Sequence, residues 1–123
     1  MRVLIVDDNS DTAFLLAELV KLCGHDAETA MSSEEALDKG KQFDPELVFL
    51  DIGLPGCNGY RLAPRLRGEA GLTNARIVAY SGYKDDPDLR LTAGIDAHLL
   101  KPVSLEQLKE FFDCEPLERK VPA

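Results

Sequence analysis

Three carboxylates stand directly after apolar segments of this chain. Asp7 and Asp8 follow residues 3–6, and Asp51 follows residues 47–50. A short apolar run that stops at polar or turn residues is typical of a strand buried on both faces, so these acids are expected at strand ends. Carboxylates brought together repel one another, and a hard divalent cation relieves that repulsion. The pattern therefore predicts a metal site.

The expected cofactor is Mg²⁺ or Mn²⁺. Magnesium takes oxygen ligands, keeps several waters and is typically held by one or two carboxylates together with a phosphate oxygen. Asp8 and Asp51 are the expected direct ligands, with the backbone carbonyl of Gly53 beside them. Asp7 is expected to act through water.

Two further residues at the ends of apolar segments suit a phosphate group. Ser81 follows residues 76–80, and Lys101 follows residues 97–100. The lysine provides a point charge for a phosphoryl oxygen, and the serine hydroxyl can donate to the same group. Acids, a metal, a lysine and a hydroxyl are the parts of a phosphoryl-transfer site. We expect Asp51 to be the nucleophile and an aspartyl phosphate to be the product.

The elements that must position these residues alternate between strand and helix. Strands are expected at residues 3–6, 26–30, 47–50, 76–80 and 97–100. Helices are expected from Asn9 or Ser10 to about Cys23, from Ser32 through 37, around 62–66, from Pro87 to about 93 and at 105–112, the last opened by a capping box at Ser104. In the first helix, Leu15, Leu19 and Leu22 are expected to widen the buried face formed by 13, 16, 17 and 20.

Five strand–helix repeats predict an α/β fold, in which a parallel sheet is covered by helices on both faces. Right-handed crossovers favour a doubly wound, flavodoxin-like three-layer sandwich with strand order 2-1-3-4-5. The switch point of that order lies between the first and third strands, whose ends carry Asp7, Asp8 and Asp51.

Composition limits the remaining function classes. The 123 residues suit one domain, and a net charge of -8 argues against a nucleic-acid partner. The three cysteines contain no CxxC pair, so neither a zinc site nor a disulfide framework is predicted. No segment suits a signal peptide or a membrane span, and we expect a cytoplasmic protein without membrane insertion. His25 and the cysteines are expected to be structural, and Arg61, Arg65 and Arg67 to form a solvated face.

Four motifs occur in order at the ends of the expected strands. They are Val6-Asp7-Asp8-Asn9, Leu50-Asp51-Ile52-Gly53-Leu54-Pro55-Gly56 with Asn58-Gly59, Tyr80-Ser81-Gly82 and Leu100-Lys101-Pro102. Each is weak alone, and each could belong to a turn or a helix cap. Together they make residues 2–112 resemble the receiver domain of two-component response regulators.

The resemblance implies a role for each residue of the site. Asp51 would be the phosphoacceptor, Asp7 and Asp8 the metal-binding acid pair, Ser81 the switch hydroxyl and Lys101 the phosphate-contacting base. The peptide bond before Pro102 would be cis. The receiver domain would occupy residues 1–113, with 114–123 as a tail or the start of a linker.

The resemblance also implies partners and a kind of activity. The phosphoryl donor would be a sensor histidine kinase or a histidine phosphotransfer protein, and the domain would be a signalling switch rather than an enzyme. Phosphorylation would reshape a surface formed by residues 85–93, His98 and 104–112, which a downstream effector or a second copy of the chain could bind. A stand-alone regulator and a domain of a longer regulator or hybrid kinase are both consistent with the sequence.

Two residues depart from the family pattern. His98 stands where relatives carry Phe or Tyr, three residues before the lysine, and Gly82 stands where alanine is common. Imidazole can act as a switch ring, although a histidine late in a strand is also consistent with a structural role.

Two other functions remain as alternatives. A magnesium-dependent phosphohydrolase resembling the haloacid dehalogenase family would need an acid two residues after the nucleophile, where this chain has Gly53. A receiver-like interaction module that is never phosphorylated would not need the complete set of acids and lysine.

Overall fold

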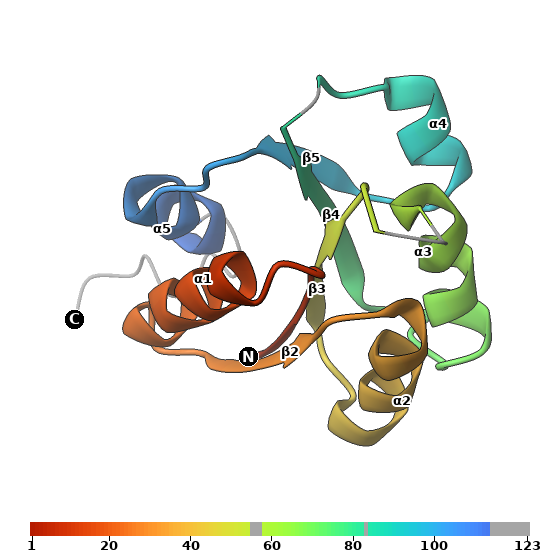
Figure 1. The fold of residues 1–123 in the computed structure, drawn as a ribbon, viewed down its shortest axis with the longest axis horizontal. Helices are drawn as coiled ribbons and strands as arrows, with labels where there is room; N and C mark the ends of the chain where they lie inside the picture. Colours follow the sequence, from red (N-terminus) through yellow and green to blue (C-terminus); the bar gives the residue numbers. More distant parts are fainter. Residues whose placement is uncertain (55–57, 83, 114–123) are drawn as a thin grey trace.

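Strands and helices alternate along the whole of the described chain, as predicted. The computed structural model describes residues 1–54, 58–82 and 84–113. The strands are β1 (Arg2–Val6), β2 (Asp26–Ala30), β3 (Leu47–Asp51), β4 (Arg76–Ser81) and β5 (Ala97–Leu100). The helices are α1 (Ser10–Leu22), α2 (Ser33–Phe43), α3 (Gly59–Gly68), α4 (Pro87–Thr92) and α5 (Leu105–Asp113) (Figure 1).

The five strands form one parallel sheet with the order β2-β1-β3-β4-β5. This is the predicted doubly wound, flavodoxin-like arrangement, and the prediction is confirmed. Its register pairs Val6 with Leu50 and Asp51 with Tyr80. The carboxyl ends of β1, β3 and β4 therefore meet at one edge of the sheet.

Helices cover both faces of the sheet, which gives three layers. Helices α1 and α5 lie on one face, and α2, α3 and α4 lie on the other (Figure 1). Each face has its own core, since successive side chains of a strand point to opposite sides. Val3, Ile5, Phe49 and Tyr80 pack toward α1 and α5, whereas their neighbours on the strands pack with α2 and α3.

Side-chain caps begin α1, α2, α4 and α5, close to the helix starts that the sequence predicts. The side chains of Asn9, Ser32, Asp86 and Ser104 each accept a hydrogen bond from a backbone N–H three residues later, at 3.0, 3.1, 3.3 and 3.1 Å. At Ser104 the capping box is reciprocal, because its own N–H donates to Gln107 Oε1 at 3.0 Å. These caps satisfy N–H groups that have no partner inside the helix.

The predicted buried face of α1 is wrong in part. Leu15 and Leu22 do not widen the buried face of α1, because they are 60% and 72% exposed. The sheet covers only the stripe through Ala13, Leu16, Ala17 and Val20, and both leucines lie outside it. Helix α2 continues beyond residue 37 to Phe43, and Asp44 then adopts a left-handed conformation.

Arg67 also differs from its prediction, because it does not belong to a solvated face. Its guanidinium donates to the carbonyl oxygens of Gly94 at 2.7 Å and Ala75 at 2.8 Å, and it pairs with Asp96 Oδ2 at 3.1 Å. The side chain therefore joins the end of α3 to the turns that precede β4 and β5. Only the guanidinium of arginine offers enough donors in one plane to do this.

Among the described helices, none combines the length and the apolar character that a membrane crossing requires. The predicted tail at 114–123, the loop residues Pro55 and Gly56, and two of the cysteines, Cys57 and Cys114, lie outside the described residues.

Candidate phosphoryl-acceptor and metal site

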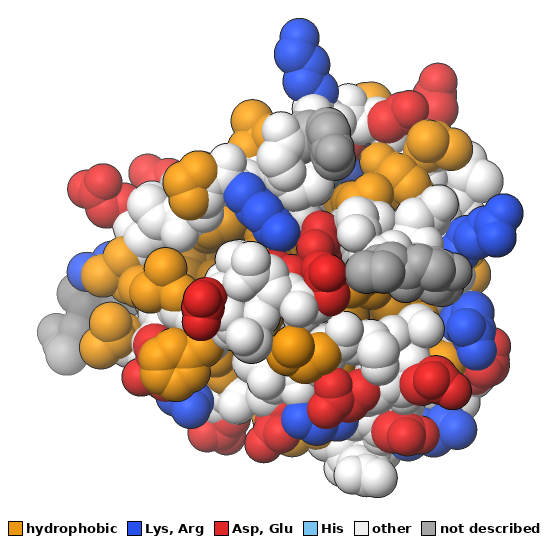
Figure 2. All heavy atoms as spheres, in the orientation of Figure 1, with side chains coloured by type: hydrophobic (Ala, Val, Ile, Leu, Met, Phe, Trp, Pro, Cys, Tyr) orange, Lys and Arg blue, Asp and Glu red, His pale blue; other side chains and the backbone are white. Residues whose placement is uncertain are grey.

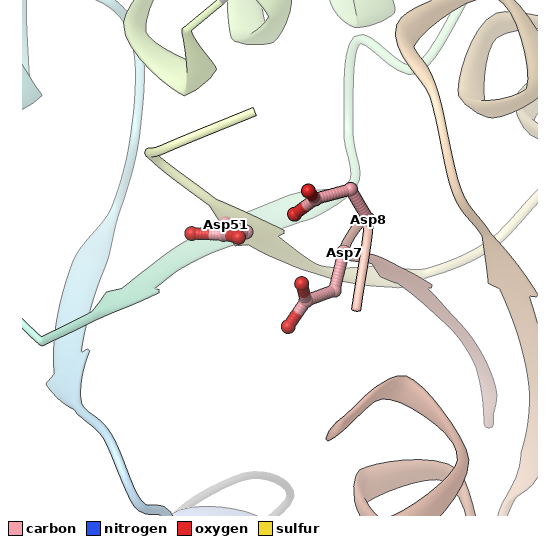
Figure 3. Close-up of side chains that lie close together, drawn as sticks. All are labelled: Asp7, Asp8 and Asp51. Carbon is pink, nitrogen blue, oxygen red and sulfur yellow. The ribbon is translucent and has the colours of Figure 1, made fainter. Parts of the chain in front are cut away.

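The three predicted carboxylates lie together at the carboxyl edge of the sheet. Asp7 and Asp8 continue from β1, and Asp51 ends the neighbouring strand β3. Asp7, Asp8 and Asp51 each offer a carboxylate oxygen within 4.8 Å of the others (Figure 3). Figure 2 shows acidic side chains gathered at the centre of this face of the molecule, with a basic side chain beside them.

Asp7 is the most deeply placed of the three acids, and both of its carboxylate oxygens accept hydrogen bonds. Its Oδ1 accepts from the Asn9 N–H at 2.9 Å. Its Oδ2 accepts from the Tyr80 hydroxyl at 2.7 Å and from Lys101 Nζ at 3.1 Å. Asp8 is exposed and Asp51 is buried beside it. The donors around Asp7 leave Asp8 and Asp51 as the carboxylates better placed to bind a cation directly.

Lys101 provides the positive charge of the site. Its ammonium nitrogen lies 3.4 Å from Asp51 Oδ2, in addition to its contact with Asp7. The same nitrogen lies 4.7 Å from the centre of the Tyr80 ring, within the range of a cation–π interaction. The peptide bond between Lys101 and Pro102 is cis, the isomer that the family resemblance implied.

The two buried carboxylates have pKa values shifted in opposite directions. Burial alone would raise the pKa of Asp7, but its hydrogen-bond donors and the Lys101 ammonium lower it below its ordinary value. Burial raises the pKa of Asp51, and the negative charge of Asp7 adds to this effect. Lys101 alone therefore does not neutralise the site, and a divalent cation would stabilise both ionised carboxylates. The donor set, which consists of carboxylate oxygens, fits a hard cation such as Mg²⁺.

Gly53 lies beside Asp51, in the turn that follows β3. Its backbone N–H donates to Asp51 Oδ1 at 3.0 Å, and this bond holds the turn after β3 against the carboxylate. At the start of α3, the N–H of Gly59 donates to the Ile52 carbonyl at 2.9 Å. A Cβ atom at Gly59 would meet the Asp51 carbonyl oxygen at 2.9 Å, so only glycine allows this close approach.

Ser81 and His98 lie together on the opposite face of the sheet from Tyr80. Ser81 is buried at the end of β4, and its Oγ lies 3.1 Å from His98 Nε2 on β5. Strand alternation explains the pairing, since Ala79 is in register with His98 and Ser81 follows Ala79 by two residues. The imidazole ring thus faces Ser81, the side that a switch role requires.

Comparison with known proteins identifies this arrangement. The family model described as the response regulator receiver domain matches residues 3–113. The chain belongs to this family. Receiver domains are signalling domains of two-component systems, and the fold described above is theirs.

Individual relatives agree with this assignment. The transcriptional regulatory protein PrrA of Mycobacterium leprae is 33% identical over 107 residues, which cover 87% of this chain and 46% of that protein. The sensor histidine kinase RcsC of Salmonella typhi is 32% identical over 111 residues, which cover 89% of this chain and 12% of that protein. This receiver domain therefore spans less than half the length of these curated relatives.

The solved structures give the same result. The response regulator receiver domain from Methylobacillus flagellatus has a TM-score of 0.84 and 29% identity, and the match covers 93% of this chain and 97% of that one. A two-component response regulator from Clostridium difficile has a TM-score of 0.84 and 27% identity, with 99% of both chains covered.

One residue of this receiver site, Tyr80, has no role in the sequence prediction, where it appears only at the end of a buried strand and as the first residue of the Tyr80-Ser81-Gly82 motif. Tyr80 is 1% exposed, and burial raises its pKa well above the ordinary value. The phenol therefore stays protonated and donates a hydrogen bond to Asp7. The alternation of side chains along a strand offers a signal for the position of Tyr80. Two residues before Tyr80, Val78 faces α1 and α5, as Phe49 does two residues before Asp51. The expected pairing of the third and fourth strands then brings Tyr80 beside Asp51.

Proposed function

We propose that Asp51 accepts a phosphoryl group in a reaction that requires Mg²⁺, and that this modification switches the signalling state of the receiver domain. The observation that carries the proposal is the position of Lys101 Nζ, 3.4 Å from Asp51 Oδ2, at the edge where three carboxylates meet. A lysine held there can contact an oxygen of a phosphoryl group on Asp51.

The proposed donor is a phosphohistidine of a histidine kinase or of a histidine phosphotransfer protein. A carboxylate oxygen of Asp51 attacks the phosphorus atom, the phosphorus–nitrogen bond breaks, and the imidazole of the donor leaves with the electron pair and takes up a proton. Asp8, Asp51 and the Gly53 carbonyl would hold Mg²⁺, with Asp7 in support, and the bound ion would supply positive charge for the phosphoryl oxygens. Lys101 supplies the remaining positive charge, and its contact with Asp7 keeps it beside Asp51.

Ser81 and His98 are the proposed switch. The Ser81 hydroxyl, now 3.1 Å from His98 Nε2, moves to a phosphoryl oxygen, and the imidazole then changes its position on β5. The surface that would respond has exposed apolar side chains, because Leu89, Leu91 and Leu100 are 50%, 66% and 51% exposed. None of the residues of α4 is buried, which allows this helix to shift at little energetic expense. We propose that an effector or a second copy of the chain binds this surface.

The proposal extends to the setting of the domain. We propose that residues 1–113 form the receiver unit, that it works in the cytoplasm, and that it catalyses no reaction of other substrates. Relatives that are named transcriptional regulators and sensor histidine kinases support a role within two-component signalling.

Intact-mass measurement tests the central step. The protein is incubated with Mg²⁺ and acetyl phosphate, and we expect a mass increase of one phosphoryl group. Asp51→Asn and addition of a chelator should abolish the increase, whereas Asp38→Asn, which alters an exposed acid on α2, should not. An increase that survives in Asp51→Asn would contradict the proposal. Steady release of phosphate from small phosphomonoesters would favour a phosphohydrolase instead.

A further inference from the structure

Tyr80 joins the two oppositely charged partners of the site. Its hydroxyl donates to Asp7 Oδ2 at 2.7 Å, and Lys101 Nζ lies over its ring, 4.7 Å from the centre. Both side chains therefore use one aromatic residue as a support, and Lys101 also contacts Asp7 at 3.1 Å. The three groups form a closed triangle of contacts.

The position of Tyr80 is set by the core rather than by solvent. Its ring packs edge-on against Phe49, with 6.3 Å between the ring centroids, and it belongs to the cluster that contains Leu108 and Phe112 of α5. A ring that is 1% exposed has few alternative rotamers, so its hydroxyl oxygen is held at one place. The hydrogen bond from this fixed hydroxyl therefore restricts the orientation of the Asp7 carboxylate.

From this geometry we infer that Tyr80 is a positioning residue of the phosphoryl-acceptor site, which orients Asp7 for its contact with the cation through water and supports Lys101 beside Asp51. The inference rests on the proposed function, because it concerns the same cation and the same acceptor. Asp7 has a single Oδ2 atom for two donors. The hydroxyl satisfies part of that oxygen's hydrogen-bonding capacity, which leaves Lys101 able to contact Asp51 as well.

The hydroxyl and the ring of Tyr80 make separate contributions to the site. Removal of the hydroxyl leaves the core and the cation–π contact in place, but among the described residues Asp7 then keeps only Lys101 as a donor to Oδ2. We expect Asp7 to draw Lys101 closer and to lose its orientation toward the cation. Groups that support metal ligands in this way change metal affinity by about 10–100-fold when they are removed.

Calorimetric titration with Mg²⁺ tests the inference. In Tyr80→Phe the Kd for Mg²⁺ should rise about tenfold relative to the wild type. The matched control is Tyr60→Phe, which removes a phenol hydroxyl from α3, outside the acidic cluster, and should leave the Kd unchanged. An unchanged or lower Kd in Tyr80→Phe, or an equal rise in both variants, would overturn the inference.

Two further measurements distinguish a loss of Mg²⁺ binding in Tyr80→Phe from a folding defect and from a failure of the proposed function. Thermal unfolding of the metal-free proteins shows whether Tyr80→Phe is folded at the assay temperature. If it is not, the wild-type hydroxyl proton of Tyr80 is observed by NMR: protection from exchange and a shift on Mg²⁺ addition support the inference, and free exchange overturns it. If the wild type binds Mg²⁺ but gains no phosphoryl group from acetyl phosphate, the proposed function fails while the Mg²⁺ comparison still decides the role of Tyr80.

Discussion

The ammonium nitrogen of Lys101 lies 3.1 Å from Asp7 Oδ2, although 94 positions separate the two residues in the chain. The Asp7 side chain is buried, whereas the Lys101 side chain is 26% exposed. A buried carboxylate is stable only when donors surround it, so this contact contributes to the fold as well as to the chemistry.

Replacement of Lys101 by methionine should therefore destabilise the metal-free protein. We expect a loss of about 1–3 kcal/mol in the free energy of unfolding, because a buried charge loses a charged hydrogen-bond partner. Urea denaturation in the presence of a chelator measures the loss. Lys21→Met is the control, since the ion pair of Lys21 with Glu18, at 3.6 Å, is exposed, and this variant should change stability by less than about 1 kcal/mol. Similar losses in the two variants would contradict the assigned role of Lys101.

The ionised Asp51 carboxylate should destabilise the metal-free protein, whereas Lys101 stabilises it. Its pKa is raised above the ordinary value of 3.8, so the folded state binds its proton more tightly than the unfolded state does. Its contribution to stability is greatest below pH 3.8 and is lost as the pH rises from there through the raised pKa. Asp51→Asn removes this penalty and should stabilise the metal-free protein at pH 7 by on the order of 1 kcal/mol.

The same substitution should reduce stabilisation by Mg²⁺. Thermal unfolding of the wild type and of Asp51→Asn, each with a chelator and with Mg²⁺, gives both quantities.

Asp7 has the opposite pH dependence of stability from Asp51. Its pKa is lowered, so its contribution is present above pH 3.8 and is lost as the pH falls through the lowered value. Destabilisation by Asp51→Asn in the metal-free protein would contradict the repulsion described here.

Gly59 is predicted to tolerate no side chain. A Cβ atom there would lie 2.9 Å from the Asp51 carbonyl oxygen and 3.0 Å from the Ile52 Cα atom, both of which are backbone atoms. Gly59→Ala should reduce the free energy of unfolding by about 1–3 kcal/mol and should also weaken Mg²⁺ binding, because α3 must move away from β3.

Gly68 is the matched control for this substitution, since it lies in the same helix and a Cβ atom there meets nothing within 4 Å. Gly68→Ala should leave stability unchanged or raise it by up to about 1 kcal/mol. Equal stabilities of the two alanine variants in denaturant unfolding would show that α3 packs less closely than described.

Arg67 should resist even a conservative substitution. Lysine has the same charge, but it cannot reach Gly94 O and Ala75 O together while pairing with Asp96. Arg67→Lys should destabilise the protein by about 1–3 kcal/mol, because carbonyl oxygens lose their partners. Arg65→Lys, which alters an exposed pair with Glu69, should remain within about 0.5 kcal/mol in the same thermal unfolding experiment. A stability of Arg67→Lys equal to that of Arg65→Lys would count against the anchoring role.

Much of the fold follows from short-range patterns. The apolar runs at residues 3–6 and 47–50 end at acids, and each helix begins at a residue whose side chain can cap it. Both signals act between residues near one another in the chain, so they can be read without knowledge of the fold. They were sufficient to place Asp7, Asp8, Asp51 and Lys101 at one edge of a parallel sheet.

The contacts within that edge depend on the tertiary structure. Nothing local indicates that the Tyr80 hydroxyl reaches Asp7, that Arg67 spans two turns, or that Leu15 stays in solvent. These outcomes depend on strand register, on the width of the stripe that the sheet covers and on the packing of side chains distant in sequence. The sequence by itself determined which chemical groups reach the edge of the sheet, because strand ends are local features. Only the tertiary structure decided how those groups pair, because hydrogen bonds and burial depend on distances between residues far apart in the chain.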